Sequence, residues 1–179
     1  MRAALKTALE RYRPLDPGEA KHRERMLALA DAAGDPFRRD HFAPGHFTAS
    51  AFILSPARDA LLLVHHAKLG RWLQPGGHFE PSDADPLAAA RREALEEVGL
   101  ADLAREVEGP FDVDVHAFPA FGAEPAHEHF DLRFLLRAAG EAHVRSEESR
   151  DSRWFQLGEL EASGFDASVL RAVRKLAPR

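Results

Sequence analysis

Three glutamates, Glu93, Glu96 and Glu97, are spaced along the segment RREALEEVGL, which covers residues 91–100. An α-helix advances about 100° per residue, so the three carboxylates share one narrow face. Like charges at this spacing destabilise a helix mildly, and carboxylates beside a core are costly unless they are paired or bind a metal. Oxygen ligands suit Mg²⁺ or Mn²⁺, and Mg²⁺ completes its coordination with water and substrate phosphate. On the helix alone, a solvated acidic face is the simpler interpretation.

The loop before this helix favours the metal interpretation. The segment PGGHFE places Gly76 and Gly77 next to each other, just ahead of an acidic loop. Glycine is used where the backbone must approach a ligand closely, and its carbonyl can serve as a neutral metal ligand. The glycine pair and the glutamates together therefore indicate one site.

Residues 76–100 resemble the Nudix box, the signature of the Nudix hydrolase superfamily. That signature is written G-x5-E-x7-R-E-U-x-E-E-x-G-U, where U is a bulky aliphatic residue. The preceding RWLQPGG at 71–77 is similar to the usual approach in this family, a Trp followed by Pro-Gly-Gly. The helical half of the signature is matched by Arg92, Glu93, Glu96, Glu97, Gly99 and Leu100.

The resemblance implies Mg²⁺-dependent (or Mn²⁺-dependent) hydrolysis of a phosphoanhydride bond. The substrate would be a nucleoside diphosphate linked to another moiety X, or a similar organic pyrophosphate. Divalent ions would be held by Glu93, Glu96 and Glu97 with the Gly76 carbonyl, while Arg92 orients a glutamate by ion pairing. Two alternatives stay open, an isopentenyl-type isomerase on the same fold and a non-catalytic nucleotide-sensing module. A module that only binds does not need the glutamates, so their retention favours catalysis.

The loop half of the box departs from the family pattern. Counted from Gly77, the first glutamate position holds Asp83, whereas counted back from Arg92 it holds Ala84, so the loop is one residue longer. Its acidic residue is therefore Asp83, Asp85 or Glu80. Ala94 is also smaller than the aliphatic residue that the family prefers at its position.

We expect the loop, and not the helix, to absorb the extra residue. A slip inside the helix would rotate the glutamates by about 100° away from the site, whereas lengthening a loop costs little. Asp85 is a good N-cap and Pro86 suits a first helical position, so the helix should begin at 85–87. Asp83 should then be displaced outward, which would leave it, or Glu80, with at most a water-mediated role.

A second conspicuous segment is PAHEHFD at 125–131. His127 and His129 lie two residues apart at the entry of a strand and should point the same way, as a Zn²⁺ site would require. No third ligand is evident nearby, which argues against zinc. By analogy with the family's extra acid or histidine beyond the box, His127, Glu128 and His129 are candidates for substrate binding or general-base catalysis. Surface residues at a strand start are an equally good interpretation.

Glu147, in the segment RSEESRDSRW, is a further candidate near the substrate. Relatives place a loop glutamate here as a base, although most acidic loops are merely solvated.

The surrounding pattern predicts an α/β fold, a Nudix-like α/β/α sandwich with a mixed sheet, preceded by two N-terminal helices. Residues 1–44 are expected to form the helical extension and residues 45–179 the Nudix domain. Helices are expected at 2–12, from Asp16 toward Gly34, at 87–98 and at 166–177. Strands are expected at 47–54, 60–66, 111–118, 129–137 and 153–157, and a loop at 70–86.

Composition excludes several classes of protein. The 179 residues carry a net charge of −5 and no cysteine, which excludes disulfides and thiolate metal sites. No basic segment suggests nucleic acid as a partner, and no apolar run is long enough to span a membrane. We therefore expect a cytoplasmic protein with a small-molecule substrate. The N-terminal helices offer a possible homodimer contact.

Overall fold

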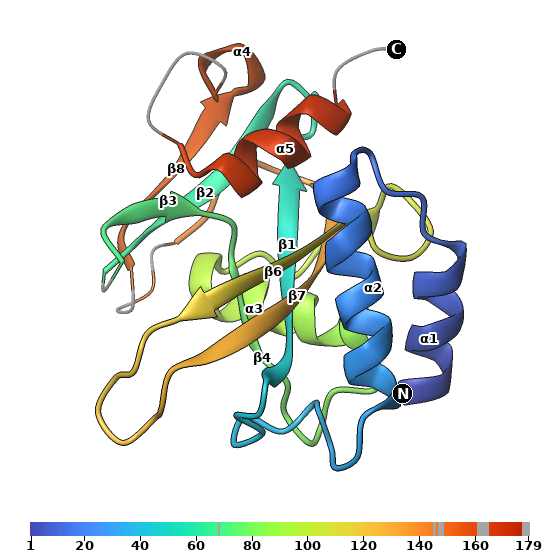
Figure 1. Cartoon of the computed structure of the whole chain (residues 1–179). Helices are drawn as coiled ribbons and strands as arrows, with labels where there is room; N and C mark the ends of the chain where they lie inside the picture. Colours follow the sequence, from blue (N-terminus) through green and yellow to red (C-terminus); the bar gives the residue numbers. More distant parts are fainter. Residues whose placement is uncertain (68, 145, 147–148, 161–164, 177–179) are drawn as a thin grey trace.

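The computed structural model describes the chain except residues 68, 145, 147–148, 161–164 and 177–179 (Figure 1). The elements are α1 (Arg2–Arg11), α2 (Pro17–Asp31), β1 (Gly45–Leu54), β2 (Ala60–His66), β3 (Arg71–Leu73), β4 (Gly76–His78), α3 (Pro86–Val98), β5 (Leu103–Arg105), β6 (Asp112–Phe118), β7 (His127–Ala138), β8 (Ser149–Gln156), α4 (Leu157–Leu160) and α5 (Ala167–Leu176).

The strands form a mixed sheet. Strand β1 pairs in parallel with β7, and the other strand pairs are antiparallel. The main strand order is β3-β2-β1-β7-β5, while β4 pairs with β1, β6 with β7 and β8 with β2.

Local signals set the ends of the helix that carries the glutamates. The Asp85 side chain accepts a hydrogen bond from the Ala88 N–H at 2.8 Å, and Pro86 is the first residue of α3. Gly99 ends the helix in the left-handed conformation, at φ 71°, which favours glycine. The predicted start at 85–87 is confirmed, so the extra residue lies in the loop.

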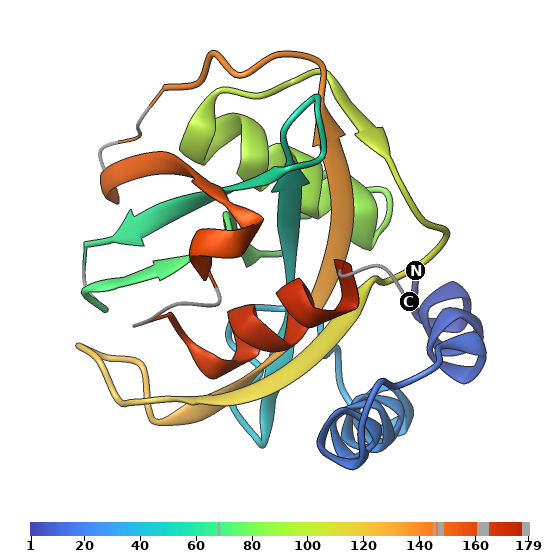
Figure 2. The same ribbon diagram turned by 90° about the horizontal axis from the view of Figure 1, so that it is seen from above.

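Two hydrophobic clusters hold the layers together. The first joins α1, α2 and α3 to the sheet, and the second joins α4 and α5 to its other face, to which β8 contributes Phe155. Figure 2 shows α3 and α5 on opposite sides of the sheet. Ala90 and Ala94 are fully buried, and their small side chains let α3 lie close to β1. The predicted mixed α/β sandwich with two N-terminal helices is confirmed.

The N-terminal helices share the core of the rest of the chain. Leu9 and Met26 are fully buried in the first cluster, and α2 packs along β6 (Figure 1). The division into an extension at 1–44 and a domain at 45–179 stays a prediction. Within the described chain, no helix combines the length and apolar character needed to cross a bilayer.

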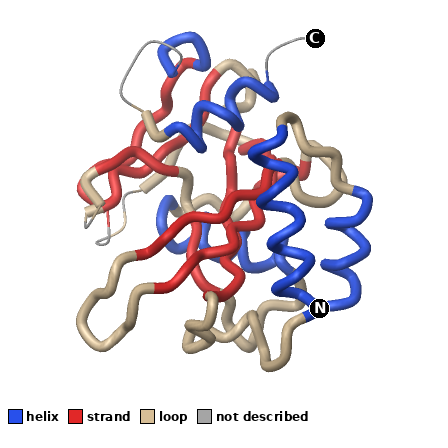
Figure 3. Tube along the Cα trace, viewed as in Figure 1, coloured by secondary structure: helices blue, strands red, loops and turns tan. Residues whose placement is uncertain are grey.

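The tertiary structure differs from the sequence prediction in its strands. The expected loop at 70–86 contains β3 and β4, because the glycine pair hydrogen-bonds to β1 (Figure 3). The strand at 111–118 alternates apolar and polar residues as a half-buried strand does, yet two of its polar residues are buried. Asp112 and Asp114 are buried, because arginines from β7 and α5 pair with them.

Candidate active site

The carboxylates of α3 meet the glycine pair of β4. The Gly76 N–H donates to Glu97 Oε1 at 3.0 Å. A Cβ on Gly77 would lie 2.6 Å from Glu93 Oε1, and a Cβ on Gly76 would lie 2.8 Å from the Ala49 carbonyl oxygen of β1. Because the backbone of β1 cannot easily move away, Gly76 is the position where the close approach requires glycine.

Arg92 gathers the acidic side chains around one guanidinium. Its Nη1 donates to Glu93 Oε1 at 2.9 Å and to Glu96 Oε2 at 3.0 Å. Its Nη2 donates to the His78 carbonyl at 2.7 Å and to Asp83 Oδ2 at 3.1 Å. Burial alone would lower the pKa of Arg92, but hydrogen bonds to Asp83 and Glu93 raise it above its usual value. The guanidinium stays charged and fixes two of the three glutamates.

The predicted outward displacement of Asp83 is wrong. Its side chain is only 4% exposed and accepts from the Glu80 N–H at 2.8 Å, besides holding Arg92. A turn from Glu80 to Asp83, closed by the Asp83 N–H to the Glu80 carbonyl at 3.0 Å, directs the aspartate inward. The half-buried guanidinium of Arg92 needs this anion. Glu80 itself is 57% exposed and lies 3.9 Å from Arg92.

The α3 face suits a hard divalent cation that is only partly held by protein. Glu93 is largely sheltered, with 13% of its side chain exposed, while Glu96 is 53% exposed. The three glutamates do not form a closed cage of oxygens within 4.8 Å of one another. Mg²⁺ takes one or two carboxylates and keeps sites for water and phosphate, so an open acidic face fits it.

A buried histidine cluster lies on the sheet. His46 of β1 is directly opposite His129 of β7, which is directly opposite His116 of β6. The rings of His46, His127 and His129 form a triangle with centroids 4.9, 4.9 and 5.0 Å apart. His127 and His129 do point the same way, with Nε2 atoms 3.1 Å apart, and both are buried, so the surface interpretation is wrong.

The expectation that no third ligand lies near His127 and His129 is also wrong. Ring nitrogens of His46, His127 and His129 lie within 4.8 Å of one another, the only such His, Asp or Glu group of three found among the described residues. The local sequence pattern around His127 and His129 does not include His46, because His46 lies on another strand, β1. Burial lowers the pKa of His46 and of the neighbouring His78 to about 4, and that of His129 further, so these rings are neutral near pH 7.

The remaining candidates lie elsewhere. Glu128 alternates to the opposite face of β7 and pairs with Arg25 of α2. Glu147 lies outside the described residues. A shallow depression of about 590 Å³ lies beside His127, and its lining also includes Pro44 and Phe118.

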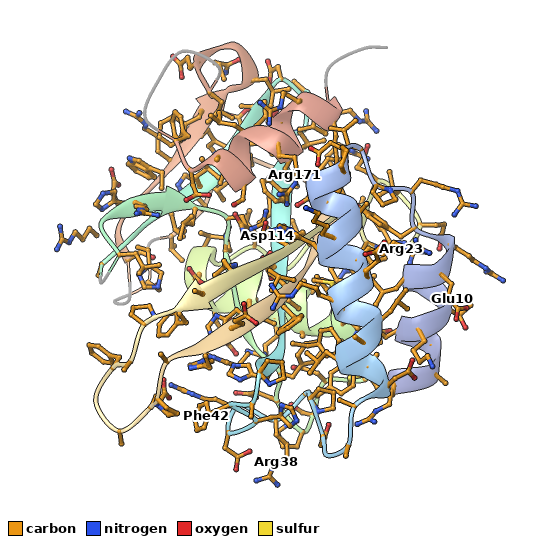
Figure 4. The ribbon with its side chains drawn as sticks, viewed as in Figure 1. Glu10, Arg23, Arg38, Phe42, Asp114 and Arg171 are labelled. Atoms are coloured by element: carbon orange, nitrogen blue, oxygen red, sulfur yellow. The ribbon has the colours of Figure 1, made fainter. Side chains whose placement is uncertain are left out.

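Sequence reasoning missed a buried network of charges between the sheet and α5. Arg133 pairs with Asp112 at 3.1 Å, Asp114 at 3.2 Å and Asp131 at 2.8 Å. Arg171 of α5 pairs with Asp112 and Asp114, and Figure 4 shows Asp114 and Arg171 close together. The only signal for this network in the sequence was the presence of polar residues within the strands.

A second part of this network connects the sheet to the neighbouring helices. Lys175 adds contacts to Asp112 and to Glu19 of α2. On the side nearer the glycine pair, Asp131 accepts from Ser50 at 2.8 Å and from Gln74 at 3.2 Å. Polar groups thus run continuously along this face of the sheet.

Comparisons with known proteins agree on one family. The family model described as NUDIX domain matches residues 44–175. No curated protein sequence matches the chain. A NUDIX-family hydrolase from Clostridium perfringens is 24% identical with a TM-score of 0.59, covering 73% of this chain and 95% of its own. An Ap4A hydrolase from C. elegans, in a binary complex, is 20% identical with a TM-score of 0.56, covering 72% and 93%. The NUDIX domain of Shewanella oneidensis NrtR, complexed with ADP ribose, is 14% identical with a TM-score of 0.52, covering 72% and 84%.

Proposed function

Because the chain belongs to the NUDIX family of hydrolases, we propose that it hydrolyses a phosphoanhydride bond with the help of Mg²⁺ or Mn²⁺ at the carboxylate face of α3. The substrate class is a nucleoside diphosphate linked to another moiety, or a similar organic pyrophosphate. The observation that carries the proposal is the convergence of Glu93 and Glu97 on Gly76 and Gly77, with Arg92 holding the acidic set.

The chain's own residues prepare this face. The Gly76 N–H orients the Glu97 carboxylate, and Arg92 orients Glu93 and Glu96. Asp83 in turn holds Arg92, so the guanidinium cannot swing toward a bound phosphate. Such fixed positioning is what phosphoryl chemistry requires, because stabilising charge and aligning groups supply most of the rate.

A divalent ion bound here would neutralise the pyrophosphate and lower the pKa of a bound water. Glu93, Glu96 and Glu97 are the residues that would hold it, with the Gly76 carbonyl as a neutral donor. A cation is needed because a polyphosphate would otherwise meet the negative charge of Glu93, Glu96 and Glu97.

Two other functions remain distinguishable. An isomerase of the isopentenyl type would rearrange its substrate without cleaving the diphosphate. A sensing module would bind a nucleotide without turnover, and the ADP ribose bound to the NUDIX domain of NrtR makes that alternative concrete.

A substrate screen tests the proposal. Nucleoside triphosphates, nucleotide sugars, ADP-ribose and dinucleoside polyphosphates are incubated with the protein and Mg²⁺, and released phosphate, pyrophosphate or nucleoside monophosphate is measured. We expect at least one substrate to be cleaved, with no cleavage when EDTA removes the metal. Glu108→Gln is the matched control, because that glutamate is 87% exposed and pairs with the nearby Arg105.

Three results separate the possibilities. Cleavage that Glu97→Gln abolishes and Glu108→Gln preserves supports the hydrolase. Binding of a nucleotide with no product after prolonged incubation supports the sensor. Conversion of an isopentenyl-type diphosphate with no released phosphate supports the isomerase.

A further inference from the structure

We propose that His46, His127 and His129 form a second metal site, separate from the α3 carboxylates, that binds a divalent transition-metal ion of the Zn²⁺ type. The site does not depend on the proposed hydrolase activity. It is made of imidazole nitrogens from two strands, where the α3 face is made of carboxylate oxygens.

The arrangement of the three rings suits one ion. Nitrogens bound about 2.0–2.1 Å from one tetrahedral Zn²⁺ are roughly 3.4 Å apart. The Nε2 atoms of His127 and His129 are already 3.1 Å apart, and one ring nitrogen of each histidine lies within 4.8 Å of the others.

Backbone carbonyls hold two of the rings in the tautomer that a metal needs. His127 Nδ1–H donates to the Pro125 carbonyl at 2.7 Å, and His46 Nδ1–H donates to the His41 carbonyl at 3.3 Å. Each Nε2 is then a lone-pair acceptor, and that of His127 accepts a hydrogen bond from His129 Nε2–H at 3.1 Å, a proton that a metal ion would displace to His129 Nδ1. Metal-binding histidines are commonly oriented by a carbonyl on the other ring nitrogen in this way.

His46 Nε2 supplies an independent observation. This atom is buried, in a residue only 1% exposed, and it has no hydrogen-bond partner. A buried acceptor without a donor costs free energy, and native structures avoid it unless water or an ion is bound. The lone pair of His46 Nε2 is therefore available to a metal ion.

The shell around the cluster resembles a metal pocket in its polarity. The Phe118 ring stacks on His129 with centroids 4.7 Å apart, and Phe42, labelled in Figure 4, lies 5.0 Å from His127. Apolar walls strengthen metal–ligand bonds and exclude water. Three nitrogens leave a fourth tetrahedral position, as in zinc sites that bind a water or a substrate atom. A depression lined by His127 and Phe118 lies next to the cluster.

The backbone must pass unusually close to itself to bring these histidines together. A Cβ on Gly45 would lie 1.8 Å from the Glu128 carbonyl oxygen, so only glycine lets β1 begin beside β7 at this level. That pairing sets His46 opposite His129. Both the histidine cluster and the α3 carboxylates contact β4. The glycine pair of β4 lies at the carboxylates, and His78, the next residue, has its ring centroid 5.0 Å from that of His46.

Ligand chemistry separates the two sites. Imidazole suits Zn²⁺, Co²⁺, Ni²⁺ and Cu²⁺, whereas carboxylate and water suit Mg²⁺ and Mn²⁺. We therefore expect Zn²⁺ or Co²⁺ at the histidines in the presence of a large excess of Mg²⁺. The ion in the histidine site should survive loss of the glutamates.

The test uses Co²⁺ as a coloured probe on the full chain. The variant Glu93→Gln/Glu96→Gln/Glu97→Gln is titrated with Co²⁺ in the presence of Mg²⁺, and the visible spectrum and bound metal are measured. We expect one equivalent of Co²⁺ with the intense bands of a four-coordinate ion. Adding His46→Phe should weaken binding by about 100-fold or more, and His143→Gln, which alters a histidine outside the cluster, should leave it unchanged.

Several outcomes overturn the proposal. Binding of no Co²⁺ to the glutamate variant would leave a buried water as the partner of His46. Binding that is equally weakened by His143→Gln, or unaffected by His46→Phe, would place the metal elsewhere.

A measurement on the unmodified chain keeps the proposal testable if His46→Phe does not fold. Anomalous diffraction at the zinc edge, from crystals soaked in Zn²⁺ and Mg²⁺, should show a peak between the three rings. A zinc peak only at the α3 carboxylates would contradict the assignment.

Discussion

Two acidic clusters in this molecule differ in how their charge is balanced. On β6 and β7, Asp112, Asp114 and Asp131 are buried and meet Arg133, with Arg171 and Lys175 reinforcing two of them. On α3 and its loop, a single guanidinium, that of Arg92, pairs with four carboxylates. The first set is buried among several cations, while the second is positioned by one guanidinium and includes the half-exposed Glu96.

The difference separates a structural cluster from a functional one. Buried carboxylates that are fully paired hold strands and helices together and have no capacity for another cation. Carboxylates that are positioned by an arginine and a backbone N–H, yet remain partly exposed, can accept an ion from solution. Counting acids alone would not distinguish the two sets, whereas the supply of nearby cations does.

The largest effect should come from removing the cation of the buried cluster. Arg133→Met leaves Asp112, Asp114 and Asp131 buried without their main partner, so the free energy of unfolding should fall by about 3–5 kcal/mol. Chemical denaturation measures it. Arg38→Met is the control, because Arg38 pairs with Asp40 at the surface and its loss should not change stability measurably. Equal stability of Arg133→Met and wild type would refute the structural role.

The next effect concerns the functional cluster. Glu97→Gln keeps the shape of the side chain but removes its charge, so we expect turnover to fall about 10²- to 10³-fold. The free energy of unfolding should stay close to that of the wild type. Steady-state kinetics on the best substrate of the screen, together with urea denaturation, separates the two quantities. A parallel loss of stability would show that Glu97 belongs to the structural class instead.

Acid should weaken the buried cluster. Burial alone would raise the pKa values of Asp112 and Asp114, but Arg133 and the neighbouring cations lower both below the usual value. An aspartate in the unfolded chain has a pKa of about 3.9, so below that pH the unfolded chain binds more protons than the folded one. The stability that these carboxylates add is complete above about pH 4 and declines as the pH falls further. Urea midpoints between pH 5 and 2 measure it, and a flat profile would contradict the assignment.

The smallest effect should come from Asp83, which lies between the two classes. Asp83→Asn removes the negative charge that pairs with Arg92 and leaves the glutamates themselves unchanged. Turnover should therefore fall by about tenfold, as it does for residues that orient metal ligands. The fall should be smaller than that of Glu97→Gln in the same assay. Equal losses would make Asp83 a direct metal ligand.

Short-range spacing in the sequence determined the local parts of this protein. Asp85 and Pro86 predicted where α3 begins, and the spacing of Glu93, Glu96 and Glu97 predicted a shared face, because caps and helical periodicity act within a few residues. The alternation of β7 also predicted that His127 and His129 point the same way. The Nudix resemblance rested on these same local positions.

Only the tertiary structure decided what the polar strand positions do. His46 joins His127 and His129 because β1 pairs in parallel with β7, and the sequence contains no local sign of that register. Asp112 and Asp114 are buried because α5 brings Arg171 onto them, and Asp83 faces inward because Arg92 requires an anion. These cases have the same physical reason. The partners of a buried charged side chain are distant in sequence, whereas the residues that cap a helix end are its sequence neighbours.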